Sequence, residues 1–333
     1  MTRREALTRL GAGAAVAIGG RAVAVADVPR TRDTERRHFD GIALFAITPM
    51  RLRDGRADVD FDGFERNMRF YVGHDGAYSL AVCGAVGEYH VLTPEERSRL
   101  IGIAAAVKGK RLLVAGAGGD TTPEAIANVQ AAAKAGADAA VLLPSEAVGK
   151  GGDSALVTHY LEIARAVDIG VIPYRAPVTR FNVDTVVRLL DHPRILAVKE
   201  QTGDLRFIRD AAVRTNGRMP LVPAHERMAP FSHLAGATGI TSGHANFAPT
   251  RSMELWQQLR SGRTQEAMAL ADRFAQLDTL RATYGDVLIK AGLELRGLAG
   301  GPLRKDKEAL PAEGRQALER IMREMGVLEG TTR

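Results

Sequence analysis

Eight short apolar runs recur along the chain, and a stretch with helical periodicity separates each run from the next. The runs cover residues 42–48, 77–83, 112–117, 137–143, 170–174, 195–199, 221–223 and 238–242. Two of the intervening stretches open on a hydroxyl, a proline and an acid, at Thr93-Pro94-Glu95 and Thr122-Pro123-Glu124, which is typical of helix N-termini. Buried strands that alternate with helices in this way favour an α/β fold, a parallel (β/α)8 TIM barrel.

The composition and its changes along the chain set the limits of this barrel. Residues 40–265 carry the alternating pattern, and the purely helical pattern that follows predicts a C-terminal helical subdomain over 266–333. Residues 27–39 are charged and aperiodic, which predicts a linker.

The net charge is +6, and the basic residues are scattered without forming a stripe, so we expect no nucleic-acid partner. The single cysteine, Cys83, excludes an internal disulfide and is expected to be a buried, inert thiol.

The first 26 residues have the order of an export signal. Arg3 and Arg4 precede a weakly apolar stretch over residues 10–20, and small residues follow at 24–26. The paired arginines suggest the twin-arginine type, which would deliver the folded protein to the periplasm or the extracellular space. Arg21 argues against this interpretation, and the alternative is a disordered extension on a cytoplasmic protein. The apolar stretch is too short and glycine-rich for a stable membrane span.

A lysine ends the sixth apolar run, Ile195–Lys199. Burial disfavours the ammonium form and lowers its pKa, and a neutral amine can condense with a ketone to give a Schiff base. Lys290 also follows apolar residues, but its helical surroundings predict a side chain that reaches solvent. A structural lysine is the alternative interpretation of Lys199. The barrel argues against it, because Tyr174, Gly84–Glu88 and Thr241-Ser242 also end or follow strands and would share one rim with Lys199.

Together these segments resemble the dihydrodipicolinate synthase / N-acetylneuraminate lyase family of Schiff-base-forming barrels. The matching segments are Ile47–Met50, Gly84–Glu88, Leu92–Glu96, Ala115-Gly116, Tyr174, Val198-Lys199, Gly203-Asp204, Gly239–Ser242, Asn246, Ala291–Leu298 and Gly301-Pro302. The resemblance implies a class I lyase acting on pyruvate or a related 2-oxo acid, with neither metal nor organic cofactor, and a homo-oligomer (dimer or tetramer). It places the Schiff-base nucleophile at Lys199, the proton-handling tyrosine at Tyr174 and the carboxylate-binding loop at Gly84–Gly87.

Two departures from the family pattern affect the expected chemistry. The loop has Ala85 and Val86 where the family usually carries hydroxyl residues, so only backbone N–H groups remain to hold a carboxylate, and the hydroxyl proton relay is lost. This argues against the synthase activity proper. The arginine that the family uses to bind the carboxylate is displaced, and Arg175 or Arg180 is its expected replacement.

Other positions point towards one branch of the family. Tyr89, the pair Thr241-Ser242 and Asn246-Phe247 resemble the 5-dehydro-4-deoxyglucarate dehydratases, although Tyr174-Arg175 is not their tyrosine-asparagine. Thr241 and Ser242 are expected to contact the polar tail of the substrate.

Several alternatives stay open at this point. The enamine formed from Lys199 can release a hydroxyl group, release an aldehyde or attack an electrophile, and the sequence does not choose among dehydratase, aldolase and synthase. The hydroxyl-free loop also allows an inactive barrel that binds or senses a 2-oxo acid. His225-Glu226 and His244 could form a metal site on the same rim, although their spacing matches no standard motif. Glu88 could be a general base, but an ion-paired carboxylate at the helix start is the preferred interpretation.

Overall fold

The structure, a computed structural model, describes residues 37–74, 79–143, 145–305 and 309–328. The predicted export signal lies outside these residues, as does most of the predicted linker. The last three linker residues, Arg37–Phe39, form a short 3-10 turn, η1, and Phe39 is buried in the core. Contact with the core therefore begins just before the predicted boundary at residue 40. Among the residues described, no helix has the length and apolarity needed to cross a bilayer.

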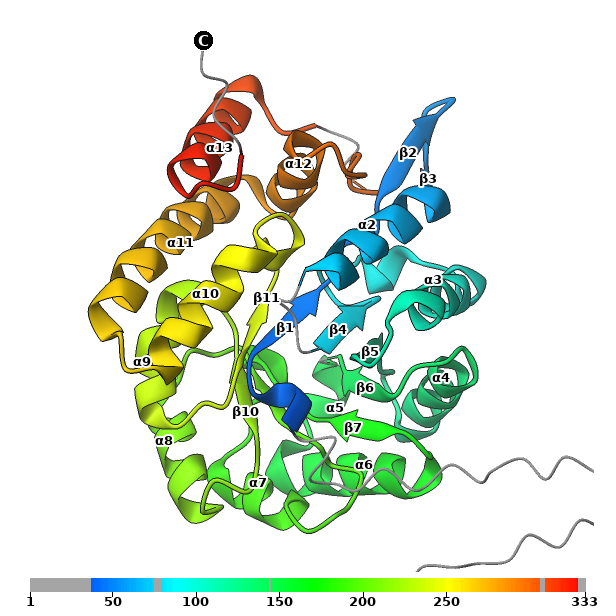
Figure 1. Cartoon of the computed structure of the whole chain (residues 1–333). Coiled ribbons are helices and arrows are strands. Elements are labelled where there is room, and N and C mark those ends of the chain that lie inside the picture. The colour runs from blue at the N-terminus through cyan, green and yellow to red at the C-terminus, as the bar shows by residue number, and fades with distance from the viewer. Residues whose placement is uncertain (1–36, 75–78, 144, 306–308, 329–333) are drawn as a thin grey trace, which may run out of the picture. The chain divides into compact units, whose positions relative to one another are not determined.

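Parallel strands form a closed ring in the described chain (Figure 1). In chain order they are β1 (Ile42–Phe45), β4 (Ser79–Val82), β5 (Leu112–Ala117), β6 (Ala139–Leu142), β7 (Gly170–Ile172) with its continuation β8 (Tyr174–Arg175), β9 (Val198–Glu200), β10 (Leu221–Pro223) and β11 (Ile240–Ser242). One ladder runs β11-β1-β4-β5-β6-β7 and the other β10-β9-β8. Parallel bridges Val171↔Ile195 and Ala224↔Thr241 join the two ladders, so the predicted (β/α)8 barrel is confirmed.

Helices follow the strands and surround the ring, as Figure 1 shows. They are α2 (Phe61–Gly73), α3 (Pro94–Val107), α4 (Thr122–Lys134), α5 (Glu146–Gly149), α6 (Gly152–Ala166), α7 (Val183–Leu189), α8 (Leu205–Arg214), α9 (Ala229–Ala235) and α10 (Pro249–Arg260). Short 3-10 turns lie in the loops: η2 (Tyr89–Val91), η3 (Pro177–Thr179), η4 (Glu226–Met228) and η5 (His244–Asn246). An antiparallel hairpin of β2 (Met50–Arg53) and β3 (Arg56–Val59) precedes α2. The strands of the ring are buried throughout because helices cover them outside and side chains fill them inside.

Three further helices complete the chain: α11 (Thr264–Tyr284), α12 (Val287–Leu295) and α13 (Ala312–Glu324). Their apolar residues, among them Phe274, Ile289 and Leu318, belong to the same core cluster as the residues of β1, β4 and β5. The predicted helical extension is present and shares a continuous core with the barrel. Polar residues of α11 and of the turn before α12 can therefore reach the rim of the ring.

The structure has helices at both predicted starts, and the predicted cap is correct at Thr93. Thr93 caps α3 in a capping box with Glu96, and Pro94 is the first helical residue. At α4 the capping hydroxyl belongs to Thr121, one residue before the predicted Thr122. The prediction was wrong by one position because two adjacent threonines offer equivalent caps.

The prediction that Lys290 reaches solvent was wrong. Lys290 is fully buried, and its Nζ contacts Glu88 at 2.5 Å and the carbonyl oxygen of Pro302 at 2.6 Å. A carboxylate 202 positions away in the sequence offsets the cost of burying the ammonium. The same contact confirms that Glu88 is an ion-paired carboxylate next to a helix start. Cys83 is buried as expected, and burial raises the pKa of its thiol to about 12.

Candidate active site

Strand register places a phenol beside the lysine. β8 pairs with β9 so that Tyr174 lies opposite Lys199 and Arg175 lies opposite Glu200. Successive side chains on a strand point to opposite faces, so Tyr174 and Lys199 turn inwards together while Arg175 and Glu200 turn towards the helices. The Lys199 Nζ lies 3.5 Å from the centre of the Tyr174 ring and 5.1 Å from that of Phe45.

The Lys199 amine is removed from water. The residue is 5% exposed, and a small apolar cavity lined by residues such as Val114, Val141 and Ile172 lies on the barrel side of it. Burial holds the pKa of Lys199 well below its usual range, the charge of Arg281 adds to this shift, and Glu200 opposes it. These are the conditions under which a lysine is a nucleophile at neutral pH.

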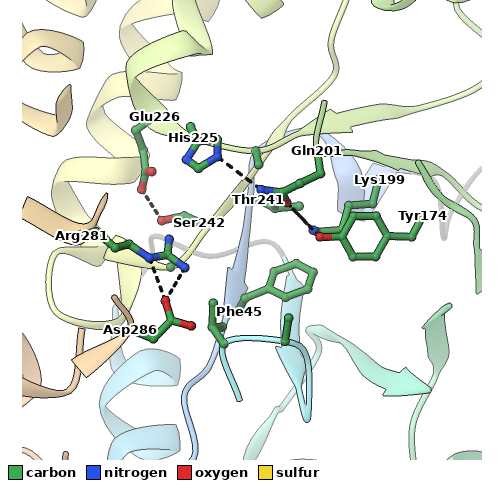
Figure 2. A pocket seen from close by; sticks show the side chains of 14 residues that line it. Phe45, Tyr174, Lys199, Gln201, His225, Glu226, Thr241, Ser242, Arg281 and Asp286 are labelled. Carbon is green, nitrogen blue, oxygen red and sulfur yellow. Dashed lines mark hydrogen bonds and ion pairs between the residues drawn. The ribbon is translucent and has the colours of Figure 1, made fainter. Parts of the chain in front are cut away.

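The side-chain amide of Gln201 connects Lys199 with Tyr174 (Figure 2). Lys199 Nζ and the Tyr174 hydroxyl both donate to Gln201 Oε1, each at 2.9 Å. Burial raises the pKa of the Tyr174 phenol, and the nearby Glu200 raises it further while Arg281 opposes the shift. The phenol therefore stays protonated at neutral pH and can donate a proton. Gln201 was not predicted as a site residue, although its position two residues after Lys199 puts it on the same face of the strand.

The lysine opens onto a cavity of about 140 Å³. Its lining residues come from the carboxyl ends of several strands and from the C-terminal helices: Phe45, Ala85, Val86, Tyr174, Lys199, Gln201, Ala224, His225, Glu226, Thr241, Ser242, Gly243, Arg281 and Asp286. In Figure 2 the group around Lys199 lies at one end, and the pair Arg281 and Asp286 lies at the other. The cavity thus offers a nucleophile at one end and charged groups at the other, with room between them for a small molecule.

The predicted carboxylate loop, Gly84–Gly87, contributes two of its four residues to the lining. Ala85 and Val86 line the cavity, whereas Gly84 does not. A Cβ on Gly84 would come within 3.0 Å of the Phe45 ring, so a glycine lets the loop pass close over that ring. The loop is tied down by bonds from the Glu88 amide to the Ala85 carbonyl and from the Thr48 hydroxyl to the Gly87 carbonyl.

Arg175, predicted to bind substrate, points away from the cavity. Its guanidinium donates to Glu200 Oε1 at 2.9 Å, to the carbonyl oxygen of Phe181 at 2.8 Å and to Asp204 at 3.2 Å, and it does not line the cavity. Glu200 is fully buried, so the pair is a buried salt bridge that ties β8 to β9 and to the start of α8. Arg180 contacts the same Asp204 from solvent. This geometry supports a structural role for both arginines.

Substitution Arg175→Ala should destabilise the fold by about 3–5 kcal/mol, because it leaves the Glu200 carboxylate buried without its partner. Arg180→Ala is the matched control. Its side chain is 61% exposed, so the loss of its bond to Asp204 should cost less than about 1 kcal/mol. Urea unfolding followed by circular dichroism measures both, and an equal small effect of the two substitutions would contradict the structural assignment.

Thr241 and Ser242 line the cavity as predicted, but their hydroxyls differ. Thr241 donates to the carbonyl oxygen of Pro223 only at 3.5 Å and can turn to a ligand. Ser242 donates to the buried carboxylate of Glu226 and accepts from the Ala245 amide at 2.8 Å. Its hydroxyl is therefore held by the protein.

Glu226 is the centre of a buried polar cluster behind this wall. It also accepts from Ser252 at 3.0 Å, and His244 Nδ1 lies 3.4 Å from it. Although burial alone would raise the pKa of Glu226, its bonds to His244 and Ser242 outweigh burial and lower it to about 2. Within the described residues, no three histidine, cysteine or acidic side chains are grouped so that they could hold a metal ion. The structure thus offers no support for the metal site considered for His225, Glu226 and His244.

Arg281 brings a guanidinium to the cavity lining and was not identified from the sequence. It lies in the last turn of α11, and its Nε and a terminal nitrogen contact Asp286 at 2.9 and 2.7 Å. No local motif marks an arginine 82 positions after the nucleophile as part of the same site. Its charge nevertheless contributes to the pKa shifts of both Lys199 and Tyr174.

Comparison with known proteins agrees with this geometry. The model of the Dihydrodipicolinate synthetase family matches residues 38–325. The chain belongs to this family. The relative from Methanoculleus marisnigri, named 4-hydroxy-tetrahydrodipicolinate synthase, is 30% identical over 292 residues, which is 85% of this chain and 98% of that protein. A probable 5-dehydro-4-deoxyglucarate dehydratase from Rhizobium rhizogenes is also 30% identical, over 85% of this chain and 94% of its own length.

Solved structures show the same fold. The chloride-inhibited dihydrodipicolinate synthase from Acinetobacter baumannii, solved with pyruvate, is 27% identical with a TM-score of 0.75, over 87% of this chain and 100% of that one. The enzyme from Cyanidioschyzon merolae, solved with lysine bound, has a TM-score of 0.80 at 24% identity, over 87% of this chain and 99% of that one. The resemblance stated from the sequence is thus confirmed at the level of the family, and the chain is a lyase of a family that works through Schiff bases with pyruvate.

Proposed function

We propose that this lyase acts on pyruvate or a related 2-oxo acid, and that Lys199 is its Schiff-base nucleophile. Neutral Lys199 attacks the C2 ketone, and the Tyr174 hydroxyl transfers the proton with which the carbinolamine oxygen leaves as water. The resulting iminium withdraws electrons from C3. The single observation that carries this proposal is the position of a buried amine 2.9 Å from an amide oxygen that also accepts from Tyr174, at the end of a cavity.

The remaining lining residues supply the binding contacts in this proposal. The backbone N–H groups of Ala85 and Val86 would hold the C1 carboxylate, since their side chains offer no hydroxyl. Thr241 and Arg281 would face the substituents beyond C3. In Figure 2 Arg281 lies at the end of the cavity opposite Lys199, and Thr241 lies between the two. A substrate with a polar tail fits this arrangement better than pyruvate alone. This favours cleavage or dehydration of a polar 2-oxo acid, and condensation onto bound pyruvate is the alternative.

Trapping the imine tests this function. The protein is incubated with pyruvate and sodium borohydride, digested, and its peptides are weighed. We expect one modified peptide, containing Lys199, heavier by pyruvate minus water plus two hydrogens. Absence of the adduct would overturn the Schiff-base proposal. An adduct without turnover of any polar 2-oxo acid would instead support the inactive binding barrel that the hydroxyl-free loop at Ala85 and Val86 suggests.

A further inference from the structure

One proton transfer has no assigned group. Once the iminium has formed, a base must take a proton from C3 to give the enamine, and the proposed function uses Tyr174 for a different transfer, the one to the carbinolamine oxygen. Ala85 and Val86 carry no basic side chain. Of the carboxylates in the lining, Glu226 is held by Ser242, Ser252 and His244, and Asp286 is held by Arg281.

His225 remains, and its hydrogen bonds fix which nitrogen is basic. Because Gln201 Oε1 already accepts from Lys199 and Tyr174, the amide group that faces His225 is the NH2, which can only donate. His225 Nε2 therefore accepts this bond and carries the lone pair. At 3.3 Å the bond is long, so a substrate atom can replace it at small cost. Lys199 Nζ thus contacts the oxygen of the Gln201 amide, and His225 Nε2 contacts its nitrogen.

A buried carboxylate lies behind the imidazole. His225 Nδ1, which bears the proton, is 3.5 Å from Asp278 Oδ1, and the Asp278 side chain is only 6% exposed. Arg227 Nε lies 3.4 Å from Asp278 Oδ2, and His244 Nε2 lies 3.9 Å from Oδ1. A carboxylate in this position holds the imidazole tautomer and stabilises the imidazolium that forms when Nε2 takes a proton.

The backbone of His225 is strained in the way that functional positions often are. Its φ of 74° and ψ of 118° lie outside the regions that side-chain-bearing residues favour. His225 directly follows Ala224, whose bridge to Thr241 closes the ring of strands, and Glu226 after it is buried in the polar cluster. The chain thus keeps a histidine in a conformation that suits glycine, with its ring facing the cavity.

We propose that His225 is the catalytic base that removes the C3 proton of the iminium, and that Asp278 is its positioning residue. This step rests on the proposed function, because it begins from the iminium of Lys199. Nε2 takes the C3 proton, the C–H electron pair becomes the C2–C3 double bond, and the C2–N π pair returns to nitrogen as its lone pair. The products are a neutral enamine and an imidazolium paired with Asp278. Returning the proton reverses the step.

Deuterium exchange at C3 of pyruvate in D2O, followed by proton NMR, measures this step, and borohydride trapping measures imine formation separately. In His225→Gly, whose new residue suits a φ of 74°, we expect exchange to slow by about 100-fold or more. Trapping should stay within about twofold of the unsubstituted protein. Added imidazole should restore exchange at least tenfold, because it replaces the missing base and not a structural contact. His90→Asn, at an exposed histidine that does not line the cavity, is the control.

Asp278→Asn tests the positioning role. It should lower kcat for exchange by about tenfold or more while KM for pyruvate stays within twofold, because the binding contacts are untouched. Asp272→Asn, at an exposed aspartate of the same helix α11, is the matched control and should change neither constant.

The remaining outcomes separate a failure of the proposed function from a failure of the role of His225. No trapping in the unsubstituted protein overturns the proposed function. Trapping without C3 exchange in that protein, or exchange in His225→Gly within threefold of it, overturns only the role of His225. A parallel fall of trapping and exchange, or slow exchange that imidazole does not restore, assigns His225 a structural role. A raised KM with unchanged kcat in Asp278→Asn overturns the positioning role.

Discussion

Lys199→Met should abolish the borohydride-trapped pyruvate adduct, with a loss on the order of 10³-fold or more in adduct formation and turnover. The substitution removes the nitrogen that is proposed to form the imine and replaces the buried amine by an apolar group of similar length. The fold should survive, because a thioether in this mostly apolar surrounding needs no partner. Peptide mass spectrometry after digestion measures the adduct, and a urea unfolding curve checks the fold.

Lys290 is a second buried lysine against which the prediction for Lys199 can be compared. It is the second lysine for which burial lowers the pKa, but its Nζ is held by Glu88 and by the Pro302 carbonyl, and it does not line the cavity. Lys290 is therefore buried like Lys199 but does not reach the cavity, and we expect it to form no imine. Lys150→Ala, at an exposed lysine, should retain full trapping. An adduct that persists in Lys199→Met and maps to Lys290 would assign the imine to Lys290 and contradict the role of Lys199.

The sequence predicted the parts of the site that follow from strand order. All eight apolar runs are strands or strand positions of the ring, and the carboxyl ends of such strands share one rim. Lys199 and Tyr174 are neighbours because their strands are adjacent and in register. Strand alternation also places Arg175, the residue after an inward-facing tyrosine, on the outer face, where it does not line the cavity. The expectation that Arg175 binds substrate was therefore wrong, because it conflicts with this alternation.

The rest of the site could not be predicted from local pattern. Arg281 and Asp278 belong to α11, beyond the strands of the ring, and only the packing of that helix brings them to the rim. Lys290 was mispredicted for the same reason, because its partner Glu88 lies 202 positions away. Periodicity shows which face of an element is apolar, but it does not show which distant polar group offsets a buried charge.

Tyr174→Phe should slow imine formation by roughly 100-fold or more, because it removes the proton donor while keeping the ring that packs against Lys199. The Tyr174 hydroxyl contacts Gln201, and the backbone carbonyl of Tyr174, which accepts from Thr179, is unaffected by the change. Lys199 keeps its own bond to Gln201, so the amine should stay in place. The initial rate of borohydride trapping with pyruvate measures the effect.

The matched control for this change is Tyr160→Phe. Tyr160 is buried in α6 against Phe181 and does not line the cavity, so the loss of its hydroxyl should leave the trapping rate within about twofold. Unchanged trapping in Tyr174→Phe would remove the phenol from the mechanism. If His225→Gly slows C3 exchange but not trapping, while Tyr174→Phe slows trapping and, because exchange requires the imine, exchange with it, the two proton transfers belong to two different residues that meet at Gln201.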